Sequence, residues 1–202
     1  MSALKVADAE GEIARVERRS DEQRYVSIFR AGKMSRGGHE ELCVLRNIST
    51  GGAMIAHNSD LAVGERIALN LRFDDQFEAQ VVWVKGDRCG VKFDDEIDLP
   101  KILAGHTAGP KPRPPRLRTA TEIKILAGST EHRALLRDIS QAGACLAVDE
   151  RVLPRDPEFR VLLEGLGTFR AIVCWRRGGF LGVNFASTLQ MWPLNDWVRS
   201  RR

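Results

Sequence analysis

The stretch Arg46-Asn47-Ile48-Ser49-Thr50-Gly51-Gly52-Ala53 returns later in the chain as Arg137-Asp138-Ile139-Ser140-Gln141-Ala142-Gly143-Ala144. The two stretches lie 138 − 47 = 91 residues apart, which is close to half of the 202-residue chain. Both follow the pattern [Asn/Asp]-x-Ser-x-x-Gly, which places a short polar acceptor, a hydroxyl and a glycine close together. That combination is suited to holding a small polar ligand.

A second echo follows downstream of the first. Trp83 with Gly90-Val91-Lys92-Phe93 is matched by Trp175 with Gly182-Val183-Asn184-Phe185, now 182 − 90 = 92 residues apart. The spacing of the two echoes differs by a single residue, which is what two copies of one domain would show. We expect both tryptophans and both phenylalanines of these stretches in the cores of their domains.

Short apolar runs with turn residues between them fill both halves of the chain. Gly- and Asp-bearing turns such as Gly37-Gly38, Gly51-Gly52 and Asp74-Asp75 separate the runs. This pattern predicts an all-β protein of two tandem small antiparallel β-barrels with short terminal helices. The runs expected as strands include Tyr25–Phe29, Leu42–Leu45, Ala53–Ala56, Arg66–Leu71, Phe77–Trp83, Glu122–Leu126 and Phe180–Phe185.

The repeat also predicts the domain boundaries. We expect a loose segment at 1–14, a first barrel at 15–104, a proline-rich spacer at 105–115 and a second barrel at 116–202. Four prolines between Pro110 and Pro115 favour an extended spacer. Short helices are expected at 94–103 and around Met191–Val198, the second packing on its own barrel.

Charge is distributed unevenly over the chain, whose net charge is +4. Residues 1–14 carry −2, residues 15–104 carry −1 and residues 105–202 carry +7. A positive second half suits an anionic partner, although on charge alone an ordinary solvated surface is the favoured explanation. Single-stranded nucleic acid would need exposed aromatic platforms, and only 6% of residues are aromatic. We therefore expect no nucleic-acid partner.

The four cysteines indicate the cellular compartment. Cys43, Cys89, Cys145 and Cys174 lack a C-x-x-C spacing and lie in apolar, strand-like contexts, which predicts buried free thiols and a reducing cytoplasm. No apolar run approaches the ~20 residues of a membrane span. The N-terminus lacks the apolar core of a signal peptide.

Motifs for catalysis are absent from the sequence. The four histidines have no metal-ligand spacing, and there is neither a Gly-x-Ser-x-Gly elbow nor a phosphate loop. We expect a non-enzyme without a metal or a cofactor.

The chain resembles the PilZ family of bacterial cyclic di-GMP receptors. The resemblance rests on the two polar patterns, the arginine arm Glu17–Tyr25 before the first strand, and the Trp…Gly-x-x-Phe pairs. The resemblance spans nearly the whole chain as two tandem copies. It implies that arm arginines clamp the dinucleotide while Asn or Asp and Ser bond the guanine edge. A guanidinium can bond guanine O6 and N7 bidentately, stack on the base or pair with phosphate.

The resemblance assigns two sets of site residues. In the favoured first domain these are Arg18, Arg19, Arg24, Asn47, Ser49 and Gly52, and in the second domain Arg116, Arg118, Asp138, Ser140 and Gly143. The arm departs from the family's Arg-x-x-x-Arg in both copies. In the first, Gln23 stands where the second arginine belongs and Arg24 follows one residue late; in the second, the stretch Arg113–Arg118 has arginines without that spacing. Each Asn/Asp-x-Ser can alternatively be a turn that satisfies its own backbone.

Two functions remain open at the level of sequence. The first is a non-catalytic cyclic di-GMP receptor that signals by ligand-induced rearrangement to a protein partner of unknown identity. The second is a PilZ-like adaptor in motility or envelope machinery that has lost nucleotide binding. Whether the arginine arm can still bind the dinucleotide distinguishes these two functions.

Overall fold

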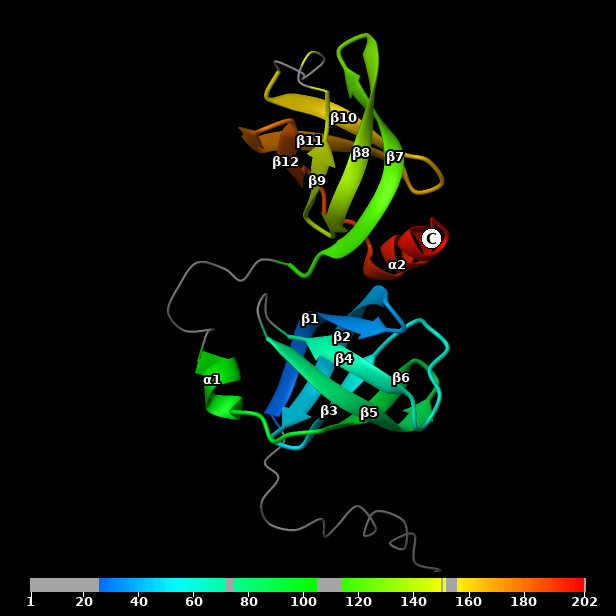
Figure 1. Ribbon diagram of the computed structural model, residues 1–202, viewed down its shortest axis with the longest axis vertical. Coiled ribbons are helices and arrows are strands. Elements are labelled where there is room, and N and C mark those ends of the chain that lie inside the picture. Colours follow the sequence, from blue (N-terminus) through cyan, green and yellow to red (C-terminus); the bar gives the residue numbers. More distant parts are fainter. Residues whose placement is uncertain (1–25, 72–74, 105–113, 150, 152–155, 202) are drawn as a thin grey trace, which may run out of the picture.

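The computed structural model describes residues 26–71, 75–104, 114–149, 151 and 156–201. It confirms the predicted fold class, because the described chain forms two closed six-stranded antiparallel barrels and two short helices. Figure 1 shows the barrels stacked end to end, with helix α2 between them.

The two barrels have the same topology. In the first, strand order is β1-β2-β3-β6-β5-β4, and β1 pairs with β4 to close the barrel. In the second, the same order reads β7-β8-β9-β12-β11-β10, and β7 pairs with β10. The first-barrel elements are β1 (Val26–Arg36), β2 (His39–Ser49), β3 (Gly52–Ala56), β4 (Arg66–Asn70), β5 (Gln76–Lys85), β6 (Arg88–Phe93) and α1 (Leu99–Ala104). The second-barrel elements are β7 (Leu117–Ala127), β8 (Thr130–Ser140), β9 (Gly143–Ala147), β10 (Glu158–Leu163), β11 (Gly167–Arg177), β12 (Phe180–Phe185) and α2 (Met191–Arg199).

Glycine pairs make the tight hairpins that keep the strands in register. Between β1 and β2, Gly37 and Gly38 have φ angles of 52° and 80°. A two-residue turn with positive φ at both positions twists as the flanking strands do, so it favours a hairpin. The dipeptide Gly178-Gly179 plays the same part between β11 and β12, with φ angles of 53° and 75°.

Each barrel encloses its own hydrophobic core. Alternate residues of β2, such as Cys43 and Leu45, are buried because successive side chains of a strand point to opposite faces. The prediction for the two phenylalanines is confirmed, since Phe93 and Phe185 are 4% and 8% exposed.

The prediction that the two tryptophans lie in the core is wrong. Trp83 is 38% exposed and Trp175 is 46% exposed. Strict alternation from Ala79 and Val81, which point inward, would also bring Trp83 inward. A β-bulge between Val81 and Trp83 inserts an extra residue and turns the indole to the outer face. A bulge between Val173 and Trp175 has the same effect in the second barrel.

The prediction of four buried thiols also needs correction. All four cysteines are free, and Cys43 and Cys89 are buried, but Cys145 is half-buried and Cys174 is exposed. Cys174 occupies the β11 bulge, where the inward alternation of side chains is interrupted. An apolar sequence context therefore did not imply burial at this position.

Helix α1 begins at Leu99, whereas the sequence predicted a helix that begins at residue 94. Asp98 accounts for this start, because its side-chain carboxylate accepts a hydrogen bond of 3.0 Å from the backbone N–H of Lys101. Such a contact satisfies a free N–H at the first turn of a helix. Across the described residues, no helix is long and apolar enough to cross a membrane.

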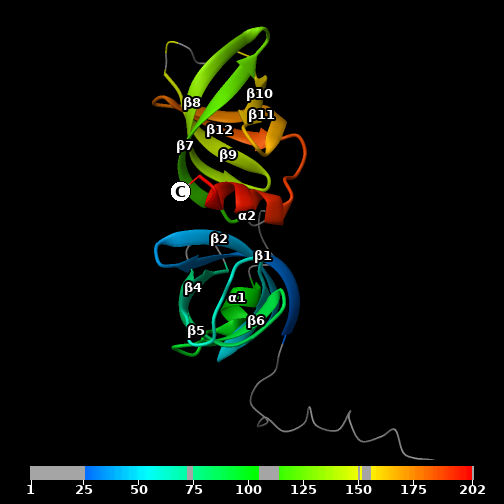
Figure 2. The same cartoon turned by 90° about the vertical axis from the view of Figure 1, so that its right-hand side faces the viewer.

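Helix α2 packs on the second barrel and also contacts the first, as both views show (Figures 1 and 2). Leu194, Trp197 and Val198 join the second core. The Asn195 side chain pairs with the backbone of Leu42 on β2, donating to its C=O and accepting from its N–H, both at 2.8 Å. The pairing of β2 with β3 starts only at Val44, so this amide takes the place of a neighbouring strand at Leu42.

Further polar contacts surround this junction between the barrels. Asn58 donates to Asp196 at 2.9 Å and accepts from Asn195 at 3.0 Å. The buried Glu41 carboxylate lies 3.4 Å from the Arg199 guanidinium, but Glu41 Oε2 and Arg199 Nε have no hydrogen-bond partner. The polar groups of the junction are therefore incompletely satisfied.

Candidate functional site

Asn47 lies near the C-terminal end of β2, on the outer face of the first barrel. It pairs with Ser27 on β1 and with Met54 on β3. Its side-chain Oδ1 accepts a hydrogen bond of 3.1 Å from the Met54 N–H, across the β-bulge at Arg46. The Asn47 Nδ2 group has no hydrogen-bond partner among the described residues.

Ser49 and Gly52 form the turn between β2 and β3. Ser49 is 2% exposed, and its hydroxyl donates to the Gly52 carbonyl at 3.2 Å. A Cβ on Gly52 would overlap the Val91 carbonyl of β6, so only glycine allows this close strand approach. Both residues shape the turn that supports Asn47, and their contact with a ligand stays a prediction.

A hollow of about 540 Å³ opens on the outer face beside Asn47. The Trp83 indole lies flat across Gly90 of the neighbouring strand, where a Cβ would overlap the ring. Sequence reasoning missed Trp83 as a surface residue, although its cross-strand glycine, repeated in the second half, was a usable signal. The hollow is lined by Asn47, Gly51, Gly52, Ala53, Met54, Val82, Trp83, Gly90, Val91, Lys92, Phe93, Asp94, Asp95 and Glu96.

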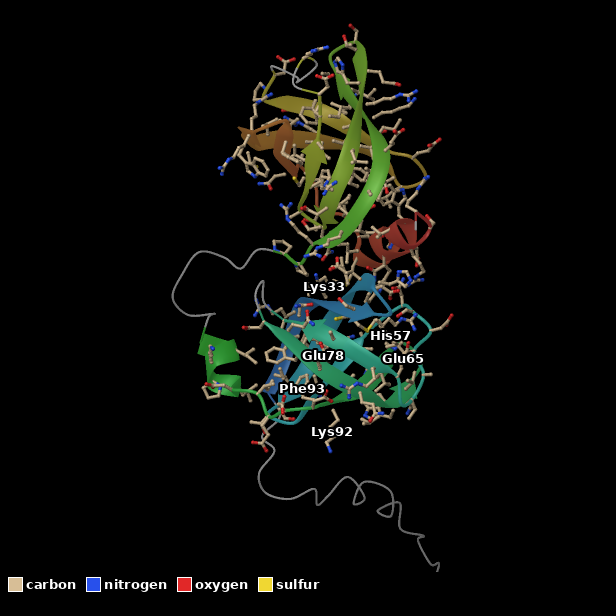
Figure 3. All side chains as sticks on the ribbon, in the orientation of Figure 1. Lys33, His57, Glu65, Glu78, Lys92 and Phe93 are labelled. Carbon is tan, nitrogen blue, oxygen red and sulfur yellow. The ribbon has the colours of Figure 1, made fainter. Side chains whose placement is uncertain are left out.

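Charges of both signs border this hollow. Lys92 is exposed, and Figure 3 shows it projecting from the end of the first barrel that faces away from the second. Asp94 is held by a double hydrogen bond from Arg66, which lowers the pKa of the carboxyl below its ordinary value. Asp95 and Glu96, which follow Asp94 directly after the end of β6, also line the hollow.

The second polar pattern has an equivalent outer row of residues. Trp175 lies over Gly182 of the neighbouring strand. Cys145 on β9 pairs with Gly182 on one side and with Asp138 of β8 on the other. Asp138 accepts a 2.5 Å hydrogen bond from the Arg116 guanidinium. The structure thus brings together two of the predicted site residues, Arg116 and Asp138, as a direct ion pair.

Ser140 and Gly143 repeat the turn of the first barrel. The buried Ser140 hydroxyl donates to the Gly143 carbonyl at 3.1 Å and accepts the Gly143 N–H at 3.2 Å. A Cβ on Gly143 would overlap the Val183 carbonyl. The turn therefore satisfies its own polar groups, as Ser in such turns often does.

Cys145 lies within the charged cluster of the second barrel. Burial is the main cause that raises the pKa of its thiol, and the Asp138 charge adds to the increase. The cations Arg116 and Arg137 act in the opposite direction. The row of residues across the second barrel consequently combines an exposed indole, a half-buried thiol and an arginine–aspartate pair.

The predicted arm arginines Arg18, Arg19 and Arg24 lie outside the described residues. Arg118 is described, and it pairs with Asp138 in the β7–β8 ladder while its side chain is exposed. Its backbone N–H donates to the Glu40 carboxylate of the first barrel at 2.8 Å. The second-barrel pattern is thereby adjacent to the junction of the two barrels.

The first-barrel pattern lies at the opposite end of its barrel. Asn47 is seven residues beyond Glu40 on the same strand, which corresponds to roughly 23 Å at about 3.3 Å per residue. One site is thus at the junction of the barrels and the other is remote from it. Within the described part of the chain, no group of three or more His, Cys, Asp or Glu residues could hold a metal ion.

The chain is similar to several solved structures at low identity. The PlzA protein of Borreliella burgdorferi in complex with c-di-GMP is 11% identical, with 88% of this chain and 93% of that chain covered and a TM-score of 0.35. The inhibitor of motility MotI/DgrA of Bacillus subtilis is 14% identical, with 88% and 100% covered and a TM-score of 0.34. The MrkH–c-di-GMP complex of K. pneumonia is 13% identical, with 85% and 84% covered and a TM-score of 0.31.

A search of curated proteins finds no significant match. The family model described as the PilZ domain matches the chain twice, at residues 17–104 and 110–192. These two ranges coincide with the two barrels and contain both polar patterns. The chain belongs to the PilZ domain family, with one copy of the domain in each half.

Proposed function

We propose that this protein is a non-catalytic, cytoplasmic receptor for cyclic di-GMP. The observation that carries the proposal is the hollow beside Asn47, because it combines unpaired amide donors, a flat indole and an exposed lysine on one face. A purine base stacks on an aromatic face, a phosphate pairs with a cation, and guanine offers acceptors to N–H donors. A dinucleotide of two guanines and two phosphates matches this set.

We place the favoured site on the first barrel. Asn47 Nδ2 would bond a guanine acceptor, and Trp83 would stack on a base. Lys92 would pair with a phosphate, and Arg18, Arg19 and Arg24 of the arm would close over the ligand. Ser49 and Gly52 would act chiefly through the turn that orients Asn47, since the Ser49 hydroxyl is buried and bonded to Gly52.

The second barrel has a different part in the proposal. Its Arg116–Asp138 pair lies beside the Arg118–Glu40 contact between the barrels. A ligand phosphate that captured the Arg116 guanidinium would compete with Asp138, beside the strand segment whose Arg118 backbone N–H bonds Glu40 of the first barrel. Ligand binding there would shift the relative placement of the barrels toward the arrangement with the better ligand contacts and expose a surface for a protein partner.

Calorimetric titration of the full chain with cyclic di-GMP tests the receptor function. We expect saturable binding, most of which is lost in Arg24→Ala, because a clamp on two guanines and two phosphates needs several guanidinium groups. Gln23→Arg, which restores the family spacing, should raise the affinity. Affinity should also fall with added salt, since part of it is charge pairing.

A protein-interaction adaptor is the second candidate. The observation in its favour is that Ser49 and Ser140 both bond their own turns, which needs no ligand. Wild-type protein without heat or thermal shift in saturating cyclic di-GMP, together with binding gained by Gln23→Arg, would support this candidate. The receptor proposal would then be withdrawn.

A further inference from the structure

Arg46 is a cation of the first barrel that forms no ion pair with a carboxylate in the described part of the chain. Among the described arginines of this barrel, Arg36, Arg66 and Arg88 each lie within ion-pair distance of an acid. The Arg46 guanidinium instead lies over the Phe29 ring, 4.6 Å from its centroid. Its Nε is buried without a hydrogen-bond partner, which leaves a charged donor unsatisfied.

Two bulges bring this pair next to Asn47. The β1–β2 register shifts between Ser27 and Arg30, which frees Phe29, and the β2–β3 register shifts between Leu45 and Asn47, which frees Arg46. Bulges re-aim side chains and are frequent beside functional sites. As a result Phe29, at 76% exposure, supports a guanidinium from the residue adjacent to Asn47.

A guanidinium stacked on an aromatic ring keeps its in-plane N–H groups free for a bidentate acceptor. The stack also fixes the orientation of the side chain, so less conformational freedom is lost when an anion binds. Among the described residues, no carboxylate forms an ion pair with Arg46, which contacts the Phe29 ring instead. A phosphodiester has the charge and the paired oxygens that this fork matches.

We propose that Arg46, held by Phe29, is a ligand-binding arginine supplied by the barrel itself, and that it binds a phosphate of the dinucleotide at the first site. This inference rests on the proposed receptor function. It gives the first barrel a guanidinium that does not depend on the displaced spacing of the arm. The second barrel has no equivalent pair, because Arg137 occupies the same bulge while Ala120 stands at the position of Phe29.

Titration calorimetry with cyclic di-GMP over a series of salt concentrations tests this assignment. The full chain is compared with Arg46→Ala, Arg46→Lys, Phe29→Leu and the matched control Arg137→Ala. We expect Arg46→Ala to weaken first-site binding at least tenfold and to flatten the dependence of log affinity on log salt concentration. Phe29→Leu should weaken it several-fold with the salt slope retained, Arg46→Lys should retain the slope with reduced affinity, and Arg137→Ala should match wild type.

The outcomes separate this inference from the proposed function. Wild-type protein that fails to bind would overturn both. Wild-type protein that binds, with Arg46→Ala binding equally well, would overturn the role of Arg46 alone. An unchanged salt slope in Arg46→Ala would overturn the phosphate assignment, because the lost contact would then be to an uncharged group. Matching thermal unfolding midpoints of the variants show that each barrel is intact.

Discussion

At the scale of single residues, Trp83 on β5 depends on Gly90 on the neighbouring strand β6 for its position on the barrel surface. The indole is exposed to solvent because the bulge turns it outward, and it is held flat because Gly90 has no side chain beneath it. The same arrangement recurs at Trp175 and Gly182. The pair therefore gives each barrel an aromatic surface without a deep pocket.

Gly90→Ala tests this arrangement. The added methyl overlaps the indole, so we expect a loss of about 1–3 kcal/mol in the unfolding free energy of the first barrel, as for other overpacked sites. The displaced indole should also weaken cyclic di-GMP binding at the first site. Chemical denaturation and calorimetry measure the two effects. Gly182→Ala is the matched control, and equal effects of both variants on first-site affinity would contradict the role of Trp83.

The double variant Asn47→Ala with Ser49→Ala tests the ranking of the two sites. Each hydrogen bond is worth roughly 0.5–1.5 kcal/mol, and more where a partner is left unsatisfied, so we expect affinity to fall by about 1–3 kcal/mol. Titration of this variant beside Asp138→Ala measures the contribution of each barrel. Loss of binding in Asp138→Ala, with binding retained in the double variant, would invert the ranking.

At the scale of elements, each strand decides the environment of the thiol that it carries. Burial is the main cause that raises the pKa of Cys43 on β2 to about 12, with smaller contributions from the charges of Cys89 and Glu41. Cys174 lies on the bulge of β11 and is exposed. The four cysteines therefore differ in exposure, and we expect them to differ in reactivity.

Thiol labelling at pH 8 tests the closure of the barrels. Only the thiolate is nucleophilic, so Cys43 and Cys89, which are buried and have pKa values raised to about 12, should resist a maleimide pulse in the folded protein. Cys174 should react quickly and Cys145 more slowly. Mass spectrometry of digested samples gives the order, and denatured protein serves as the control. Labelling of Cys43 at the rate of Cys174 would show that the first barrel is not closed.

At the scale of the whole molecule, α2 connects the two barrels through a few polar contacts. The Asn195 amide bonds both backbone groups of Leu42, and the Leu42 side chain is buried in the hydrophobic cluster of the second barrel. These contacts are few, so the relative placement of the barrels depends strongly on Asn195.

We expect Asn195→Ala to let the two barrels move independently of each other. It leaves the buried N–H and C=O of Leu42 without partners, which we expect to weaken the junction by about 2–4 kcal/mol. Small-angle scattering should show a broader distribution of dimensions, while each barrel keeps its own unfolding transition. Asp196→Ala, which removes an exposed partner of Asn58, is the control and should have a smaller effect. Unchanged scattering of Asn195→Ala would show that other contacts hold the barrels together.

The repeat of Arg46–Ala53 at 137–144, with the Trp…Gly-x-x-Phe echo, was sufficient to predict two barrels of one family. Periodic apolar residues and glycine turns specify strands and hairpins through local geometry, so these features can be read from the chain. The pattern residues Asn47 and Asp138 were also predicted as site residues, and the structure places each on an outer barrel face.

Only the tertiary structure decided where the tryptophans point, what Arg46 contacts and how α2 joins the barrels. A bulge shifts the alternation of a strand by one residue, and its position depends on cross-strand pairing that no local pattern specifies. Arg46 and Phe29 meet because two bulges on different strands coincide. The bond between Asn195 and Leu42 joins residues 153 positions apart, and it exists because β2 leaves one edge unpaired at that point. Sequence thus determined the two domains, whereas long-range pairing determined the surfaces through which they act.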